Sequence, residues 1–253
     1  MIKSKKLSKF KEISHGFFNK NGGVSKGIYK SLNCGIGSKD KKSYIKKNLN
    51  IVKFRLNKNL KKIFFVKQFH SNKFIFLNNK TNIKTRTINA DAIISEKKGL
   101  PIAILTADCV PILIYENKRK MIAAIHAGWK GAYKGVIQKV FKHMMNKGCA
   151  AKNMTVAIGP CISKSNYEVK KKFKDKFIKK DQKNIKFFNN KKNKIYFDLS
   201  NFIKKQVQLN EIKNIDLLNI DTFNKKNNFF SARRSLKLKH DDYGRNISII
   251  VLN

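Results

Sequence analysis

The sequence is poor in residues that form cross-links, linkers and acidic surfaces. Its 253 residues include four cysteines, three prolines and 15 acidic residues, against 57 basic ones. The cysteines (positions 34, 109, 149 and 161) lie far apart, so free thiols are expected rather than a disulfide framework. With so few prolines and no Ser/Gly-rich run, no linker is predicted. Residues 1–253 are therefore expected to form a single domain.

Long apolar segments are also missing. No run of 18 apolar residues occurs, so no membrane span and no membrane partner are expected. The basic start, Met1–Lys6, is not followed by an apolar core or a cleavage site, so no signal peptide is predicted. We therefore expect a cytoplasmic protein.

The formal charge of +42 is not read as a sign of nucleic-acid binding. Only six of the 57 basic residues are arginine, and lysine is spread along the chain beside abundant Asn, Ile and Phe. These residue types have A/T-rich codons, so a biased genome explains the composition more simply. A surface that follows a phosphate backbone more often uses clustered arginine with exposed aromatic residues. No nucleic-acid partner is expected. The basic charge is expected to attract anionic substrates weakly.

Apolar runs and helical periodicities alternate along the chain, which predicts an α+β domain with mixed sheets and covering helices. The runs at 100–105, 110–115 and 121–125 are continuously apolar, as in strands that are covered on both faces. Further strands are expected at 63–66, 74–77, 154–158, near 195, at 215–220 and at 247–252. Helices are expected from about Lys39 (capped by Ser38) to Leu56, over 135–145, over 167–180, and after a Ser200 cap.

Cys109 and His126 lie at the ends of two consecutive apolar runs. A thiolate and an imidazole at one sheet edge indicate either a transition-metal site or a nucleophile and its base. His70, in Gln68-Phe69-His70-Ser71, would complete a set of N, S and N ligands, as in an open zinc site with a fourth position for water or substrate. Taken singly, each of the three is also compatible with an ordinary core position.

Three of the six arginines, Arg233, Arg234 and Arg245, fall within the segment 233–245. A planar guanidinium suits phosphate or carboxylate, so we expect at least one of them to bind phosphate. The alternative is a structural salt bridge to Asp241 or Asp242. Cys161, in the Gly-Pro-Cys step, is interpreted as a packed structural thiol.

Five motifs occur in order along nearly the whole chain. They are N-A-D-A-I-I-S, L-T-A-D-C-V-P-I-L, A-A-I-H-A-G-W-K-G, A-I-G-P-C-I-S-K-S-N-Y-E-V and F-F-S-A-R-R. With them the chain resembles the laccase-domain family, once described as multicopper polyphenol oxidases and now as purine nucleoside phosphorylases. The resemblance implies an α+β sandwich related to cysteine-hydrolase toxins. It also implies that His70, Cys109 and His126 form a catalytic metal centre, with Zn²⁺ as the cofactor and copper as an alternative.

The chain departs from the family pattern in three places. Lys20 stands where the family usually has arginine, before the Gly-Gly of the N-terminal turn. A late Cys-Thr pair appears as Asp221-Thr222. The segment after Arg234 carries extra residues before Gly244-Arg245, which changes the length of that loop.

The resemblance implies phosphorolysis of adenosine, inosine, guanosine and S-methyl-5′-thioadenosine, with adenosine deamination as a side activity. Lys20, Arg233, Arg234 and Arg245 are the candidates for phosphate binding, and Asp108 is expected to orient Cys109 or to act as a general acid. The partners would be a nucleoside and phosphate, and the assembly a monomer or homodimer. A cysteine or zinc hydrolase that edits peptidoglycan precursors is one alternative. A copper-dependent polyphenol oxidase is another, although five histidines are few for four coppers.

Overall fold

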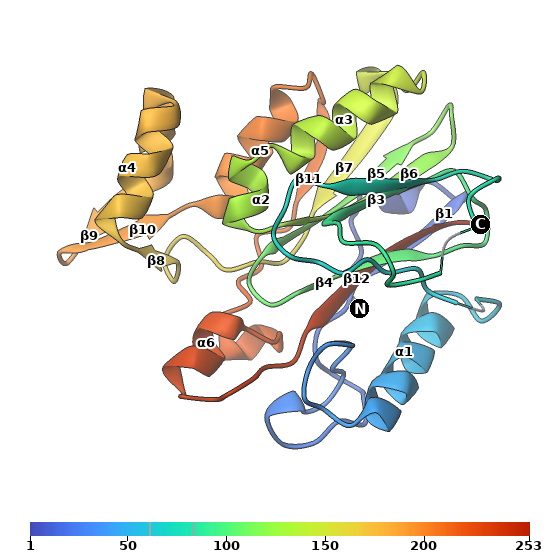
Figure 1. The fold of residues 1–253 in the computed structure, drawn as a ribbon, viewed down its shortest axis with the longest axis horizontal. Helices are drawn as coiled ribbons and strands as arrows, with labels where there is room; N and C mark the ends of the chain where they lie inside the picture. Colours follow the sequence, from blue (N-terminus) through green and yellow to red (C-terminus); the bar gives the residue numbers. More distant parts are fainter. Residues whose placement is uncertain (61, 83) are drawn as a thin grey trace.

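The computed structural model describes residues 1–60, 62–82 and 84–253, which form an α+β arrangement around a six-stranded mixed sheet (Figure 1). In spatial order its strands are β11 (Asn214–Leu217), β7 (Met154–Ile158), β5 (Val110–Glu116), β6 (Met121–Ala127), β3 (Ala92–Ser95) and β2 (Phe74–Leu77). The outer pairs β11–β7 and β2–β3 are parallel and the inner pairs are antiparallel. The predicted α+β class, with parallel and antiparallel strands mixed in one sheet, is confirmed.

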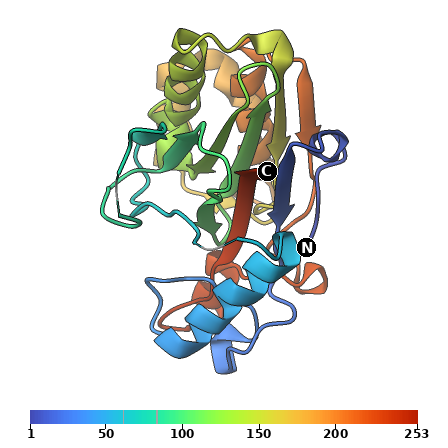
Figure 2. The same ribbon diagram turned by 90° about the vertical axis from the view of Figure 1, so that its right-hand side faces the viewer.

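A second, antiparallel sheet packs on one face of the first. It consists of β1 (Ile13–Phe17), β12 (Asn246–Leu252) and β4 (Ile102–Thr106). The other face of the large sheet is covered by α2 (Trp129–Tyr133), α3 (Val136–Asn146) and α5 (Leu199–Gln208). Helix α1 (Lys42–Leu56) covers the outer face of the small sheet, so α1 and α3 lie at opposite ends of the molecule (Figures 1 and 2).

The layering explains why the central strands are apolar at every position. In β5, Ile112 and Ile114 pack with the helices, whereas Leu113 and Tyr115 pack toward the second sheet. Successive side chains of a strand point to opposite faces, and here both faces are covered. All seven residues of β5 and of β6 are buried, which confirms the prediction of doubly covered strands.

A smaller lobe extends from one side of the molecule, at the left of Figure 1. It holds β8 (Glu168–Val169), β10 (Lys194–Phe197), β9 (Phe188–Lys191) and α4 (Lys171–Lys180). Phe177 of α4 is fully buried in an aromatic cluster, with its ring 4.9 Å from that of Phe197. The remaining helix α6 spans Ala232–Lys237, and short 3-10 helices lie at Leu7–Lys9, Gly27–Tyr29, Ala151–Asn153, Gln182–Phe187 and Lys225–Asn227. Within the described residues, no helix has the length and apolar character needed to cross a membrane.

Two of the expected helix caps are wrong. Helix α1 begins at Lys42, and the Ser38 hydroxyl instead donates to the carbonyl of Gly35 at 2.7 Å. Helix α5 is capped by Asp198, whose carboxylate accepts from the amide of Asn201 at 3.0 Å, so Ser200 lies inside the helix. The carboxylate two residues earlier satisfies one of the free N–H groups of the first turn.

Two other predicted elements, a strand and a helix, differ from the structure. The predicted strand at 63–66 is wrong, because this segment makes only an isolated bridge between Phe64 and Ile102. The predicted helix at 167–180 begins at Lys171, because Glu168 and Val169 pair with β10. The helix predicted over 135–145 is confirmed as α3 (Val136–Asn146), and the strand Phe74–Leu77 is confirmed as β2.

Candidate metal centre

Three side chains from separate segments meet at one end of the β5–β6 pair. Cys109 directly precedes β5, and His126 of β6 pairs with Pro111 of β5. His70 reaches them from the loop before β2. The possible ligand atoms of His70, Cys109 and His126 all lie within 4.8 Å of one another. Their predicted convergence is confirmed, whereas metal binding itself stays a prediction.

The spacing of the three groups suits a single small ion. The Cys109 sulfur lies 3.7 Å from Nε2 of His70, and the rings of His70 and His126 are 4.8 Å apart at 73°. Zinc bonds of about 2.0–2.3 Å in a tetrahedral shell separate neighbouring ligand atoms by roughly 3.3–3.8 Å. Only small side-chain movements therefore separate this arrangement from a coordination shell.

A fully buried carboxylate, Asp91, holds two of the three groups in place. Its Oδ1 accepts from Nδ1 of His126 at 2.8 Å and from the amide of His70 at 3.0 Å. Its Oδ2 accepts from both the amide (2.6 Å) and the hydroxyl (2.7 Å) of Ser71. These contacts fix the loop in which His70 adopts a φ of +62°. Asp91 thus orients both histidines, a role common among carboxylates behind metal ligands.

The electrostatics of this cluster favour a thiolate. Burial raises the pKa of Cys109, but the charge of His126 and hydrogen bonds from His126 and His70 outweigh it and lower the pKa to about 6. Burial lowers the pKa of His126, but the Cys109 charge and the Asp91 hydrogen bond raise it to about 9. Burial likewise raises the pKa of Asp91, yet hydrogen bonds from His126 and Ser71 bring it down to about 2. Cys109 is therefore ready to act as a ligand or a nucleophile near neutral pH.

The glycines of H-A-G-W-K-G are required by close packing. A Cβ atom on Gly128 would lie 2.8 Å from the Cys109 sulfur and 2.8 Å from Cδ2 of His70. A Cβ atom on Gly131 would lie 2.8 Å from the carbonyl oxygen of Ser71. Residues 128–131 can therefore pass directly behind the three candidate ligands only because these positions lack side chains.

A pocket of about 290 Å³ opens beside the three groups. Its wall combines apolar side chains with two guanidinium groups, from Arg86 and Arg245, and none of the described residues that line it is acidic. The lining residues are Gly37, Phe65, Val66, Gln68, His70, Arg86, Leu105, Thr106, Ala107, Cys109, His126, Tyr243 and Arg245. This pocket is the site at which a ligand can touch the candidate metal centre.

Asp108 lies beside Cys109, but its carboxylate is bound to the segment 222–233. It accepts from the hydroxyl of Thr222 at 2.7 Å, the hydroxyl of Ser231 at 2.9 Å and the amide of Arg233 at 2.7 Å. Its backbone has a φ of +88°, and burial raises the pKa of its carboxyl group. None of these partners is Cys109, and both expected roles of Asp108 stay predictions.

Arg234 and Arg233 contact protein groups outside this pocket. The guanidinium of Arg234 donates to the carbonyls of Thr222 and Phe223 at 2.8 Å and to that of Phe229. Arg233 donates to the carbonyl of Glu168 at 2.9 Å and lies over the ring of Tyr167, 5.4 Å from its centroid. Arg233 also lines a second, open groove of about 690 Å³, together with Trp129 and Phe173.

Lys20 and Arg245 occupy different surroundings. Lys20 is half-buried, and burial followed by the charge of Arg234 lowers the pKa of its ammonium group. It is not among the described residues that line the pocket with the candidate ligands. Arg245 is in that wall, and its Nη1 also lies 3.3 Å from Oδ1 of Asp242. The structural salt bridge considered for the arginine cluster is thus formed by Arg245.

The other positions singled out in the sequence have structural surroundings. Cys161 is buried, which raises its pKa, and within the described residues it does not join the group of possible ligands. Its segment pairs with Asp221, whose carboxylate accepts from the amides of Ser163 and Phe223 at 3.0 Å. The departure at Asp221 therefore has a structural role.

Sequence reasoning missed two residues of this site. Asp91 lies inside the motif N-A-D-A-I-I-S, and the signal that identifies it is an acidic residue directly before the strand Ala92–Ser95, which begins with three apolar residues. Arg86 lies outside the five motifs, and only the folded chain brings it to the pocket. Gln68, already quoted beside His70, bonds both the N–H and the C=O of Leu105 through its amide group.

The fold and the site define a class: an α+β protein with a His-Cys-His cluster at the end of its central sheet. The chain belongs to the family described as multi-copper polyphenol oxidoreductase laccase, whose model matches residues 14–253. The resemblance seen in the five motifs is thereby confirmed. A family with this description implies a bound metal, for which the three side chains provide a possible site.

Several relatives carry the name purine nucleoside phosphorylase. The one from Rickettsia conorii is 34% identical over 83% of this chain and 90% of its own length. The one from Bacteroides thetaiotaomicron is 28% identical over 92% of this chain and 91% of its own. Among solved structures, the YfiH protein of Bacillus licheniformis has a TM-score of 0.87 at 26% identity, covering 95% of this chain and 93% of that one.

Proposed function

We propose that this chain is a zinc-dependent purine nucleoside phosphorylase. The observation that carries the proposal is the meeting of His70, Cys109 and His126 beside a pocket that contains two arginines and, among its described residues, no carboxylate. The names of several relatives supply the reaction. The pocket supplies positive charge for phosphate and an apolar wall for the nucleoside.

The donor set fits zinc. Two imidazole nitrogens and a thiolate sulfur are common zinc ligands, and three protein ligands leave one position open for a reactant. Nδ1 of His126 is occupied by Asp91, which leaves Nε2 as the metal-binding atom. Zinc bound there would supply a Lewis acid that polarises an oxygen atom of a reactant. Four coppers need more imidazoles, and within the described residues this trio is the one group of three or more possible ligands.

Phosphorolysis moves the ribosyl group from the purine to phosphate. A phosphate oxygen attacks C1′ of the sugar, the bond from C1′ to N9 breaks, and the purine leaves with the electron pair and takes up a proton. Arg245 in the pocket wall neutralises the attacking phosphate, and Asp91 keeps His126 oriented. Phe65, Val66 and other apolar lining residues offer a surface for the sugar and base.

The proposed substrates are adenosine, inosine, guanosine and S-methyl-5′-thioadenosine. Deamination of adenosine is a proposed side reaction, in which an oxygen from water replaces the 6-amino group and ammonia is released. Both reactions need the same elements, a polarised oxygen nucleophile and a pocket that holds the nucleoside.

A second candidate function is supported by the spatial arrangement of Asp91, His126 and Cys109. Without metal, this arrangement resembles an orienting carboxylate, a base and a nucleophile, the pattern of cysteine hydrolases. The thiolate would attack an amide carbonyl, the amine would leave with a proton from His126, and water would release the acyl group. A peptidoglycan precursor is the substrate class considered for this activity.

The test is a product assay with and without phosphate. Zinc-loaded protein is incubated with adenosine or inosine, and the products are separated by chromatography. Free base and ribose 1-phosphate are expected only when phosphate is present. Equal release of base without phosphate would identify a hydrolase and contradict the proposal. Amide hydrolysis that survives treatment with a chelator would favour the second candidate.

A further inference from the structure

Arg86 and Arg245 share the pocket with the three candidate metal ligands. We propose that their side chains form a two-arginine clamp for the inorganic phosphate consumed in the reaction, and that the turn Gly35–Gly37 positions both arginines. This inference rests on the proposed function. It adds Arg86, which no sequence motif indicates, and gives a role to the Gly-Ile-Gly turn.

The turn packs against both arginines. A Cβ atom on Gly35 would lie 2.8 Å from Cδ of Arg245, and one on Gly37 would lie 3.6 Å from Nη2 of Arg86. Gly37 itself lines the pocket. The turn is fixed by Asn33, whose Oδ1 accepts from the amide of Gly35 at 2.8 Å and from that of Arg245 at 2.9 Å. One short segment therefore brings the two side chains to the same wall.

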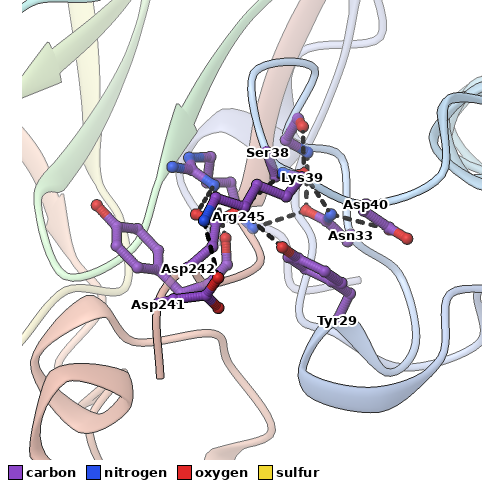
Figure 3. A network of polar contacts seen from close by, with 10 residues as sticks. Tyr29, Asn33, Ser38, Lys39, Asp40, Asp241, Asp242 and Arg245 are labelled. Atoms are coloured by element: carbon purple, nitrogen blue, oxygen red, sulfur yellow. Dashed lines mark hydrogen bonds and ion pairs between the residues drawn. The ribbon is translucent and has the colours of Figure 1, made fainter. Parts of the chain in front are cut away.

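Arg245 is held in its orientation by the network in Figure 3. Its Nη1 donates to the carbonyl of Tyr243 at 2.5 Å and to Oδ1 of Asp242 at 3.3 Å. Asp242 in turn accepts at 2.8 Å from the hydroxyl of Tyr29 and from the amide of Lys39. Within the described residues, all hydrogen bonds of the Arg245 guanidinium are made by Nη1. Its Nε and Nη2 donors are left for an anion.

Arg86 has still more unused donors. No side-chain hydrogen bond or ion pair within the described part of the chain engages its guanidinium, although its amide donates to the carbonyl of Phe65 at 2.8 Å. Its φ of +60° is uncommon for a residue other than glycine. A guanidinium with free donors in a pocket wall is the group that binds phosphate or carboxylate in a forked manner.

The charge of the pocket favours a dianion. The two guanidinium groups are permanently charged, and none of the described lining residues is acidic. A tetrahedral phosphate can accept from both forks at once and place a further oxygen toward the metal site. The same oxygens occur in a nucleoside monophosphate, so the experiment must separate these two sources.

The experiment measures binding of radiolabelled inorganic phosphate by equilibrium dialysis, without nucleoside, on zinc-loaded and on chelator-treated protein. Arg86→Lys and Arg245→Lys keep the charge but lose the fork, so the Kd for phosphate is expected to rise tenfold or more in both protein forms. Arg119→Lys, whose residue lies in the β5–β6 turn, is the matched control, with an expected change below twofold. Phosphate binding by Arg86→Lys equal to that of the wild type would overturn the clamp.

Two further arms remove ambiguity. Gly35→Ala retains both arginine residues, but its Cβ atom would displace the Arg245 side chain, so it should weaken phosphate binding severalfold. Unchanged binding contradicts the positioning role of the turn. Adenosine 5′-monophosphate should compete at least tenfold more weakly than phosphate, and tighter competition would mean that the clamp serves a nucleotide. If phosphate-independent base release refutes the phosphorylase while Arg86→Lys still weakens binding, the anion clamp stands without that reaction.

Discussion

Nδ1 of His126 donates a hydrogen bond to Oδ1 of Asp91 at 2.8 Å, and this contact directs the other ring nitrogen toward Cys109. The same carboxylate accepts from the backbone of the loop that carries His70. One buried acidic residue therefore sets the orientation of both imidazoles. The geometry of the candidate metal centre depends on Asp91 as much as on the three groups that would touch the ion.

Replacing Asp91 by asparagine should weaken zinc binding by 10- to 100-fold, because the uncharged amide holds His126 less firmly and no longer favours its metal-binding form. Competition against a coloured chelator measures the affinity. Asp175→Asn, an exposed position on α4, is the control and should leave the affinity unchanged. Equal zinc affinity in Asp91→Asn and wild type would contradict the orienting role.

The pH dependence of thiol alkylation tests the electrostatics of the metal-free site. Because the pKa of Cys109 is lowered to about 6, the rate of its reaction with iodoacetamide should be half-maximal near pH 6 and close to its maximum by pH 7. Cys34 and Cys161 are buried, which raises their pKa values, and they should stay unmodified. His126→Gln removes the main stabilising charge and should shift the Cys109 profile to higher pH. A wild-type midpoint near pH 9 would show that the thiolate is not stabilised.

Arg234 should act on stability rather than on phosphate binding. Its guanidinium bridges the carbonyls of Thr222, Phe223 and Phe229, a pattern that a lysine ammonium cannot reproduce. Loss of these bonds, at about 1–2 kcal/mol, should lower the Tm of Arg234→Lys by several degrees. The Kd for phosphate should change less than twofold. A large change in phosphate affinity with an unaltered Tm would instead support phosphate recognition by Arg234, as the arginine cluster suggested.

Much of the fold could be predicted from apolar periodicity. The predictions that are wrong lie where local signals compete. The strands β5 and β6 could be predicted because both faces are buried and every position is apolar. The cap of α5 could not, because Asp198 and Ser200 both lie near the helix start and only the folded backbone decides which accepts the first amide. At α1, Ser38 bonds the carbonyl of Gly35 instead of a helix amide. The segment 63–66 is apolar because it is buried beside β4, although it forms no strand.

The site was predictable to the extent that it lies in sequence motifs. Cys109 and His126 stand in two of the five motifs and His70 in the Gln-Phe-His-Ser segment, and their meeting follows from the β5–β6 pairing and the adjoining loop. Arg86 could not be found, since most of the residues that share the pocket with it are distant in sequence and it belongs to none of the five motifs. The separation of Arg234 from Arg245 likewise depends on tertiary contacts that a sequence cluster does not reveal.

The decisive quantity is the amount of zinc bound per chain, measured by mass spectrometry on protein whose phosphorolysis is assayed in parallel. Wild-type protein should hold about one zinc per chain. Cys109→Ala should hold little zinc and form no ribose 1-phosphate while it stays folded, because two imidazoles retain the ion too weakly. Cys149→Ala, at a buried thiol that contacts Met121, should keep both the zinc and the activity. A Cys109→Ala protein that retains one zinc and full phosphorolysis would contradict the assignment of His70, Cys109 and His126 as the catalytic metal centre.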